Sequence, residues 1–463
     1  MLTLISNLLF KKKLATLLIL IYFSFFGSIG LNINVLNIYN YDILDLINIS
    51  RYLIPFFFSI ILFFFSTFFI RLKKNYLLLF FFYFLFMIFA FFLDEKRNIN
   101  FNDIYFFILS VGLISFFYIE NYLCIRNLDK ILLNISILIT GFSAILILYL
   151  NINEISFFLK NNLYHLFTVH DKFVNHYSPR VTGIARSLGI LSIYLTYIFL
   201  FKKNYKKTCL IIIILINIII WKLQSRGAIL CYLGAFLFTI LFFKKINIKF
   251  LIQKILIFLL VPVLISQFIL NEKNYNLYFN EIIIENKNNE KKEESTNQST
   301  NQSTNQRLNE IRILDNFPLI KDKSGSGRLH LWKQALSEKQ KIFGYGILGD
   351  RYLLNDININ GLYGNNVSNI YIYSILSGGF ASLSIILVIV FIFFFKIIKI
   401  IFFKKTLSKN KDFYLPFSIS IFIFLIIRSL FENSFGVYSI DLLLFLPCIN
   451  IIYKNFHKMK NEN

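Results

Sequence analysis

Long, uninterrupted apolar runs constrain this chain more than any other feature of its sequence. The stretches Pro55–Ile70 and Leu210–Ile220 are apolar apart from isolated Ser, Thr and Asn residues. Runs of about 18–20 such residues can cross the hydrocarbon core of a bilayer. Since a segment in lipid must satisfy its own backbone hydrogen bonds, these runs are expected to be helices. With 57% hydrophobic residues and a mean hydropathy of +0.63, the sequence predicts an all-α, polytopic integral membrane protein.

The spacing of the apolar runs predicts about twelve transmembrane helices. The predicted spans are approximately residues 14–31, 52–70, 76–93, 104–119, 131–150, 183–201, 208–221, 226–243, 251–270, 369–395, 413–431 and 437–453.

Lysine and arginine are concentrated in alternate connections between these spans. About 24 of them lie in one set of connections, against about eight in the short connections of the other set. Because cytoplasmic connections carry the excess of Lys and Arg, the lysine-rich side and both termini are predicted to be cytoplasmic. The formal net charge of +23 therefore reflects topology and attraction to anionic membrane lipid. No soluble basic domain is left that could bind nucleic acid.

The connection before the tenth span divides the chain into three parts. Residues 1–270 hold spans one to nine, residues 271–368 form a large outer loop, and residues 369–463 hold the last three spans and a cytoplasmic tail. The loop contains three copies of a four-residue unit, "STNQSTNQSTNQ", at Ser295–Gln306. Because such a polar tract cannot bury enough surface to fold, residues 271–310 are expected to be flexible. The part from Ile311 regains Trp, Leu and Gly and is expected to fold.

Arginine, rather than lysine, recurs at the predicted outer ends of the spans and in the large loop. These residues are Arg180, Arg186, Arg226, Arg328 and Arg428. A guanidinium group binds phosphate oxygens through two parallel hydrogen bonds, which lysine cannot do. The cluster therefore favours binding of a lipid pyrophosphate at the outer boundary of the membrane. The alternative is that some arginines extend to the headgroups or pair with Glu432 or Asp441.

The segment "GRLHLWKQAL" at Gly327–Leu336 is predicted to be a short helix on the outer surface. Leu329, Trp332 and Leu336 recur at the spacing of one helical face, with Trp332 at the membrane interface. Arg328 then lies at the N-terminal edge of this helix, at the level of the lipid headgroups. Taken alone, the segment could equally be a structural anchor.

No motif for a metal or a nucleotide is present. His165, His170 and His176 share a loop, but their spacing matches no metal site, and the nucleotide-binding loop pattern is absent. Neither a metal nor another cofactor is therefore expected.

Four motifs, in this order, resemble the O-antigen polymerase and O-antigen ligase superfamily of bacterial envelope proteins. They are "RVTGIARSLG" from Arg180, "QSRGAIL" at Gln224–Leu230, "SGRLHLWKQAL" through "IFGYG" at Ser326–Gly346, and "SNIYIYSILSGG" at Ser368–Gly379. The predicted spans and the large outer loop before the tenth fit as well. The likeness covers mainly residues 180 to 380, and the arrangement is more specific than any single motif.

This resemblance implies a metal-independent glycosyltransferase of the bacterial inner membrane whose site faces the periplasm. Its donor would be a glycan on undecaprenyl pyrophosphate, with membrane lipid and a chain-length regulator protein as further candidate partners. A polymerase transfers the growing glycan onto the next lipid-linked repeat unit, whereas a ligase transfers it onto lipid A–core. Arg180, Arg226 and Arg328 match family motif positions and would stabilise charge on the leaving group.

Further residues are assigned by position or by motif. Arg186 and Arg428 join the substrate-binding set by position only, and Trp332 and Asn369 join it from their motifs. The attacking sugar hydroxyl also needs a general base. Ligases of the family typically carry His before the Asn of the "SNIY"-like motif, where this chain has Ser368, which favours a polymerase. Glu432 is the first candidate for the base and His330 the second.

Two readings outside the glycosyltransferases stay open. A flippase for lipid-linked oligosaccharide would need charges along a central cavity and inverted repeats, but no repeat relates the two halves here. A non-catalytic membrane scaffold would leave the arginine cluster without a role.

Overall fold

The computed structural model describes eleven stretches of the chain, and these are helical or in short turns. The stretches are residues 53–64, 75–93, 101–119, 127–150, 181–201, 206–222, 226–242, 328–337, 342–357, 367–402 and 413–462. The predicted spans 14–31 and 251–270 and the predicted flexible loop 271–310 lie outside the described residues.

The helices follow one another along the chain with one short 3₁₀ turn, η5 (Ser434–Gly436), between the last two. A first described helix, Leu53–Phe64, precedes them. Their bounds are α4 Asn75–Leu93, α5 Phe101–Ile119, α6 Leu128–Leu150, α9 Val181–Phe201, α10 Lys206–Lys222, α11 Arg226–Phe242, α16 Arg328–Ser337, α17 Gly349–Ile357, α18 Ile370–Phe402, α19 Tyr414–Ser429 and α20 Ile440–Glu462.

Each predicted span within the described part coincides with a helix. The main differences are that α18 and α20 continue to Phe402 and Glu462, beyond the apolar stretches that predicted them. Among the described helices, three are long and apolar enough to cross a membrane, namely Tyr76–Leu93, Gly183–Phe201 and Ile370–Phe402, and several others are apolar but shorter. The chain therefore has the character of an α-helical membrane protein, and the total of twelve spans stays a prediction.

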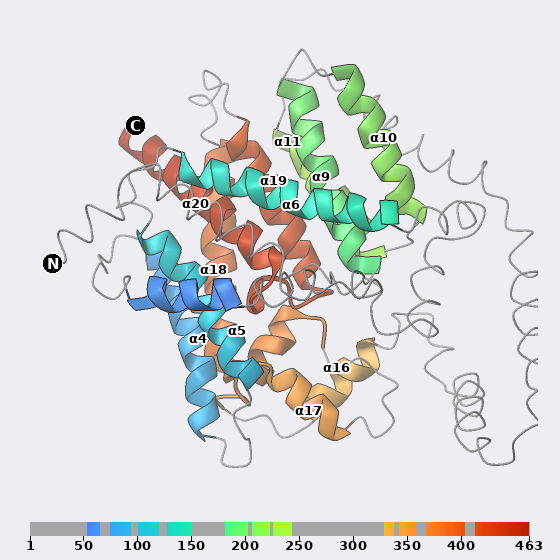
Figure 1. Cartoon of the computed structure of the whole chain (residues 1–463). Coiled ribbons are helices and arrows are strands. Elements are labelled where there is room, and N and C mark those ends of the chain that lie inside the picture. The colour runs from blue at the N-terminus through green and yellow to red at the C-terminus, as the bar shows by residue number, and fades with distance from the viewer. Residues whose placement is uncertain are drawn as a thin grey trace, which may run out of the picture.

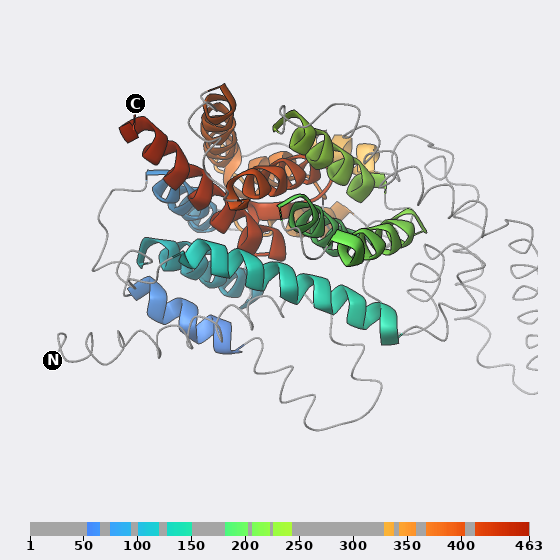
Figure 2. The same ribbon diagram turned by 90° about the horizontal axis from the view of Figure 1, so that it is seen from above.

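The C-terminal helices form the middle of the molecule. Helices α18, α19 and α20 lie between α4 and α5 on one side and α9, α10 and α11 on the other, in both views (Figures 1 and 2). Figure 1 also shows the short loop helices α16 and α17 together at one end of the molecule. Segments from the two halves of the sequence are thus packed against each other.

Side-chain contacts show that neighbouring helices alternate in direction. At one end, Asp441 at the start of α20 pairs with Arg186 near the start of α9 and with Arg428 near the end of α19. At the other end, Lys454 of α20 pairs with Asp129 at the start of α6. This alternation agrees with the directions predicted from the lysines. We call the end that holds Asp441 the outer end, because the lysine pattern predicts that it faces away from the cytoplasm.

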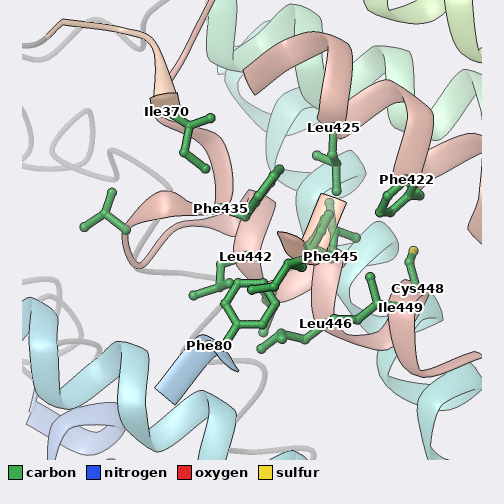
Figure 3. Close-up of a cluster of buried hydrophobic side chains, with 14 of the residues drawn as sticks. Phe80, Ile370, Phe422, Leu425, Phe435, Leu442, Phe445, Leu446, Cys448 and Ile449 are labelled. Carbon is green, nitrogen blue, oxygen red and sulfur yellow. The ribbon is translucent and has the colours of Figure 1, made fainter. Parts of the chain in front are cut away.

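One large apolar core joins these helices. Phe435 of η5 stacks on Phe445 of α20 with ring centroids 4.0 Å apart, and Phe445 also contacts Phe422 of α19 and Phe80 of α4 (Figure 3). Aromatic rings bury large apolar areas, and such ring pairs add about 0.5–1.5 kcal/mol beyond that burial. The core therefore anchors the connection between α19 and α20 at the outer end.

Buried polar groups connect α9, α10 and α11. The hydroxyl of Ser192 on α9 donates to Asn217 Oδ1 on α10 at 3.0 Å, and Asn217 Nδ2 donates to the hydroxyl of Tyr232 on α11 at 3.2 Å. Hydrogen bonds of this kind stabilise helix pairs where the surroundings cannot supply water. They hold α9, which carries Arg186, against its two neighbours.

Candidate functional site

A break in α18 shapes the outer end. Gly378 and Gly379 leave helical geometry, and Gly379 has φ 67° and ψ −164°, a region open essentially to glycine alone. The break removes the helical partners of the Leu376 and Ser377 carbonyls. The backbone N–H groups of Tyr345 and Gly346 donate to these two carbonyls at 2.6 and 2.8 Å.

The "FGYG" turn, Phe343–Gly346, therefore has a structural role: its backbone N–H groups bond to the carbonyls that the break in α18 leaves free. Gly344 has φ 74° and lies so close to α18 that a Cβ there would approach the backbone N of Gly379 to 2.7 Å. By docking into the break, the turn fixes the start of α17 at Gly349. The next residue, Asp350, is thereby placed in the interior of the outer end.

Asp350 is completely buried in the first turn of α17. Its Oδ2 accepts hydrogen bonds from the backbone N–H of Val367 and from Asn433 Nδ2, both at 3.3 Å. Its Oδ1 is buried, and no described residue gives it a hydrogen bond. Burial raises the pKa of this carboxyl above its usual value, although the charge of Arg351 and the two hydrogen bonds act in the opposite direction.

Asn433 continues the network from Asp350 to the start of α18. Its Oδ1 accepts the backbone N–H of Asn369 at 2.9 Å. The side chain of Asn369 accepts from the N–H groups of Tyr371 and Ile372 and donates to the Leu430 carbonyl at 3.1 Å. Asn369, which the sequence assigns to substrate binding, thus caps α18, as an N-cap asparagine does.

A second network is ionic and lies at the same end. Asp441 accepts from Arg428 Nε at 2.9 Å through Oδ2 and from Arg186 Nη1 at 3.2 Å through Oδ1. Arg428 and Asp441 are buried, and the Arg186 side chain is 13% exposed. The Nε of Arg186 is buried and has no hydrogen-bond partner among the described residues.

Glu432, the first candidate for the base, lies beside this ionic group. It follows Arg428 in the turn that ends α19, where its backbone N–H donates to the Arg428 carbonyl at 2.9 Å. It is half-buried and interacts electrostatically with both Arg186 and Arg428. The pairing of arginine with Asp441 that the sequence left open is therefore present for Arg186 and Arg428.

Trp332 connects α16 to the same region. It is half-buried against the core, and its indole Nε1 donates to the Val367 carbonyl at 2.6 Å. The face of α16 that packs on the protein holds Leu331 and Ala335, both buried, whereas Leu336 is exposed. Of the predicted outer face, Leu336 is thus exposed and Trp332 is half-buried, and contact of this face with the membrane interface stays a prediction.

The remaining predicted residues are placed less completely. Arg226 and Arg328 are the first residues of α11 and α16, and His330 lies in the first turn of α16. Only the backbone of these three is described. Arg180 and the three loop histidines lie outside the described residues. Within the described part of the chain, no three His, Cys, Asp or Glu side chains gather as metal ligands.

Two residues of this end were not found from the sequence, namely Asp350 and Asn433. Acidic residues are common in the first turn of a helix, so Asp350 after "FGYGILG" does not by itself indicate a functional site. Asn433 is one polar residue in the turn "FENSFG". Only their convergence with Val367 and Asn369 distinguishes them.

Comparison of the chain with family models, with curated proteins and with solved structures finds no match. A function must therefore be inferred from the residues and their arrangement.

Proposed function

We propose that this protein is a glycosyltransferase of surface-polysaccharide assembly that uses a lipid-pyrophosphate-linked glycan at the outer face of the bacterial inner membrane. Within that class we propose a polymerase of O-antigen or a related glycan. The observation that supports the proposal is that Arg186 and Arg428, 242 positions apart in the sequence, meet at one end of the helical bundle. Their pairing with Asp441 by itself fits a structural ion pair, so a pyrophosphate would bind the guanidinium donors that Asp441 leaves unused.

The ionic group has donors left for a ligand. One carboxylate neutralises only one of the two guanidinium groups, and the Nε of Arg186 is buried without a partner among the described residues. Glu432 adds a second carboxylate nearby. The positive charge that a pyrophosphate needs would therefore come also from Arg180, Arg226 and Arg328. Arg226 is the first residue of α11 and Arg328 the first residue of α16.

The proposed reaction places definite demands on these groups. The bond between the anomeric carbon and the pyrophosphate oxygen breaks, and its electron pair stays on the pyrophosphate. The acceptor hydroxyl forms the new glycosidic bond, and its proton passes to a base. The arginines would stabilise the charge on the leaving pyrophosphate, which is the largest electrostatic change of the reaction. Glu432, close to Arg186 and Arg428, is the proposed base, with His330 as the second candidate.

The ligase is the second proposal within the same class. It uses the same donor and the same leaving group, so the arginine cluster serves it equally. The feature against it is Ser368, because an alcohol at its ordinary pKa is a poor base.

The test is deletion of the gene in the native host, followed by electrophoresis of the surface glycan. A polymerase predicts loss of the ladder, leaving core with a single repeat unit. Bare core with accumulating lipid-linked polymer would instead indicate a ligase. An unchanged ladder contradicts O-antigen as the product.

Complementation then tests the arginines. The Arg328→Ala variant is expected to leave the ladder absent at a normal level of membrane protein, because it removes a guanidinium from the leaving-group site. Loss of a transition-state contact of this type costs about 100- to 1000-fold in rate. Lys333→Ala, an exposed cation on the same helix, is the matched control and should restore the ladder. A normal ladder from Arg328→Ala would contradict the role of this arginine.

A further inference from the structure

The backbone of Val367 connects α17 and α16 at the outer end. Its N–H donates to Asp350 on α17, and its carbonyl accepts from Trp332 on α16. Helix α16 begins at Arg328, four residues before Trp332. The position of Arg328 is therefore tied, through Trp332 and Val367, to the carboxylate of Asp350.

The same carboxylate oxygen also holds the connection between α19 and α20. Asn433 donates to Asp350 Oδ2 and accepts from the backbone of Asn369. Asn433 lies between Arg428 and Asp441 in the sequence, in the connection whose two ends form the ionic group. One buried oxygen thus connects the helix that carries Arg328 with the segment between Arg428 and Asp441, and Asp441 in turn pairs with Arg186 of α9.

We propose that Asp350 is a positioning residue, which sets the place of Arg328 relative to Arg186 and Arg428 and so shapes the pyrophosphate-binding site. The inference rests on the proposed function of the arginines as ligands of a pyrophosphate. Asp350 acts through Val367 and Asn433 and does not itself contact the substrate.

The carboxylate of Asp350 lowers the stability of the fold, because its burial is compensated only in part. Its two donors share one oxygen, and the other oxygen is buried with no hydrogen bond from the described residues. A buried polar atom without a hydrogen bond costs free energy of folding, and each such atom calls for an explanation. The raised pKa of Asp350 has the same origin in burial.

The experiment compares loss of the acceptor at position 350 with its replacement by a neutral acceptor. In Asp350→Ala, the N–H groups of Val367 and Asn433 lose the oxygen that they share. In Asp350→Asn, the amide oxygen can take the place of Oδ2 and accept from both groups, and the amide N–H₂ takes the place of Oδ1. The hydrogen-bond network is then kept without the charge of the carboxylate.

Binding of inorganic pyrophosphate to the purified full-length protein in lipid nanodiscs is measured by calorimetry, together with Tm and with polymer formation. We expect Asp350→Ala to weaken pyrophosphate binding by about tenfold, which corresponds to about 1.4 kcal/mol. Asp350→Asn should keep Tm, binding and polymer formation together, because it retains the two hydrogen bonds.

Each other outcome has one meaning. If Asp350→Asn keeps Tm but not binding, or if Asp350→Ala binds pyrophosphate like the unchanged protein, the positioning role is wrong. If Asp350→Asn keeps Tm and binding but not polymer formation, Asp350 acts on the reaction directly and the positioning role is again wrong. If the unchanged protein neither binds pyrophosphate nor forms polymer, the proposed function itself fails.

Discussion

Replacing Asp441 by alanine is expected to destabilise the protein by about 3–5 kcal/mol, because it leaves Arg186 and Arg428 buried with no shared counter-charge. Both arginines pair with this carboxylate, at 3.2 and 2.9 Å, and Arg428 is almost completely buried. Desolvation of two cations is then compensated only in part by Glu432. The measurement is Tm of the purified protein and the yield of monodisperse protein from membranes.

A triple replacement separates folding from function at this ionic group. Exchange of the whole group for apolar residues of similar volume, Arg186→Met, Arg428→Met and Asp441→Leu, should be much less destabilising than Asp441→Ala alone. It should nevertheless form no glycan ladder, because the guanidinium groups are gone. A Tm of Asp441→Ala equal to that of the unchanged protein would mean that the ionic group contributes little to stability.

The Gly379→Ala variant should lose folded protein through strain at the break of α18. The conformation of Gly379 costs a non-glycine residue about 1–3 kcal/mol. In addition, a Cβ there would lie 1.9 Å from the carbonyl oxygen of Ile342, so the turn that plugs the break must move. This displacement would release the hydrogen bonds of Tyr345 and Gly346 to α18. The expected results are a large fall in Tm and loss of the glycan ladder.

Gly183→Ala is the matched control for this prediction. Gly183 lies in the helix α9, and a Cβ there would meet nothing within 4 Å. Alanine favours a helix over glycine by about 1 kcal/mol, so this variant should be as stable as the unchanged protein or more stable. Equal stability of Gly379→Ala and Gly183→Ala would show that the break does not depend on the glycine conformation.

Much of the helical architecture could be predicted from the sequence. Apolar runs such as the one that became α4 are long, contain no charged residue and need a helix to satisfy their backbone. The alternation of lysine-rich connections also predicted that α9 and α20 begin, and α19 ends, on one side, and the contacts of Asp441 bring these three helix ends together. These features depend on local composition, and local composition is what a sequence displays.

The candidate site could be predicted only in part. Arginine at the outer helix ends was a visible signal, and Arg186 and Arg428 do meet at one end. Helical spacing grouped Leu329, Trp332 and Leu336, but it could not show that Leu331 and Ala335 are the residues of α16 that pack on the protein. Asn369 was assigned to the substrate, yet its side chain caps α18.

By itself, the sequence determined that the chain is helical and that it is apolar enough for a membrane. The tertiary structure alone decided that the "FGYG" turn fills a break in α18, that Asp441 serves two arginines, and that Asp350 meets Asn433 and Val367. The physical reason is distance along the chain. Burial and hydrophobicity act on each segment separately, whereas an ion pair or a buried hydrogen bond exists only when folding brings remote segments within about 3 Å of each other.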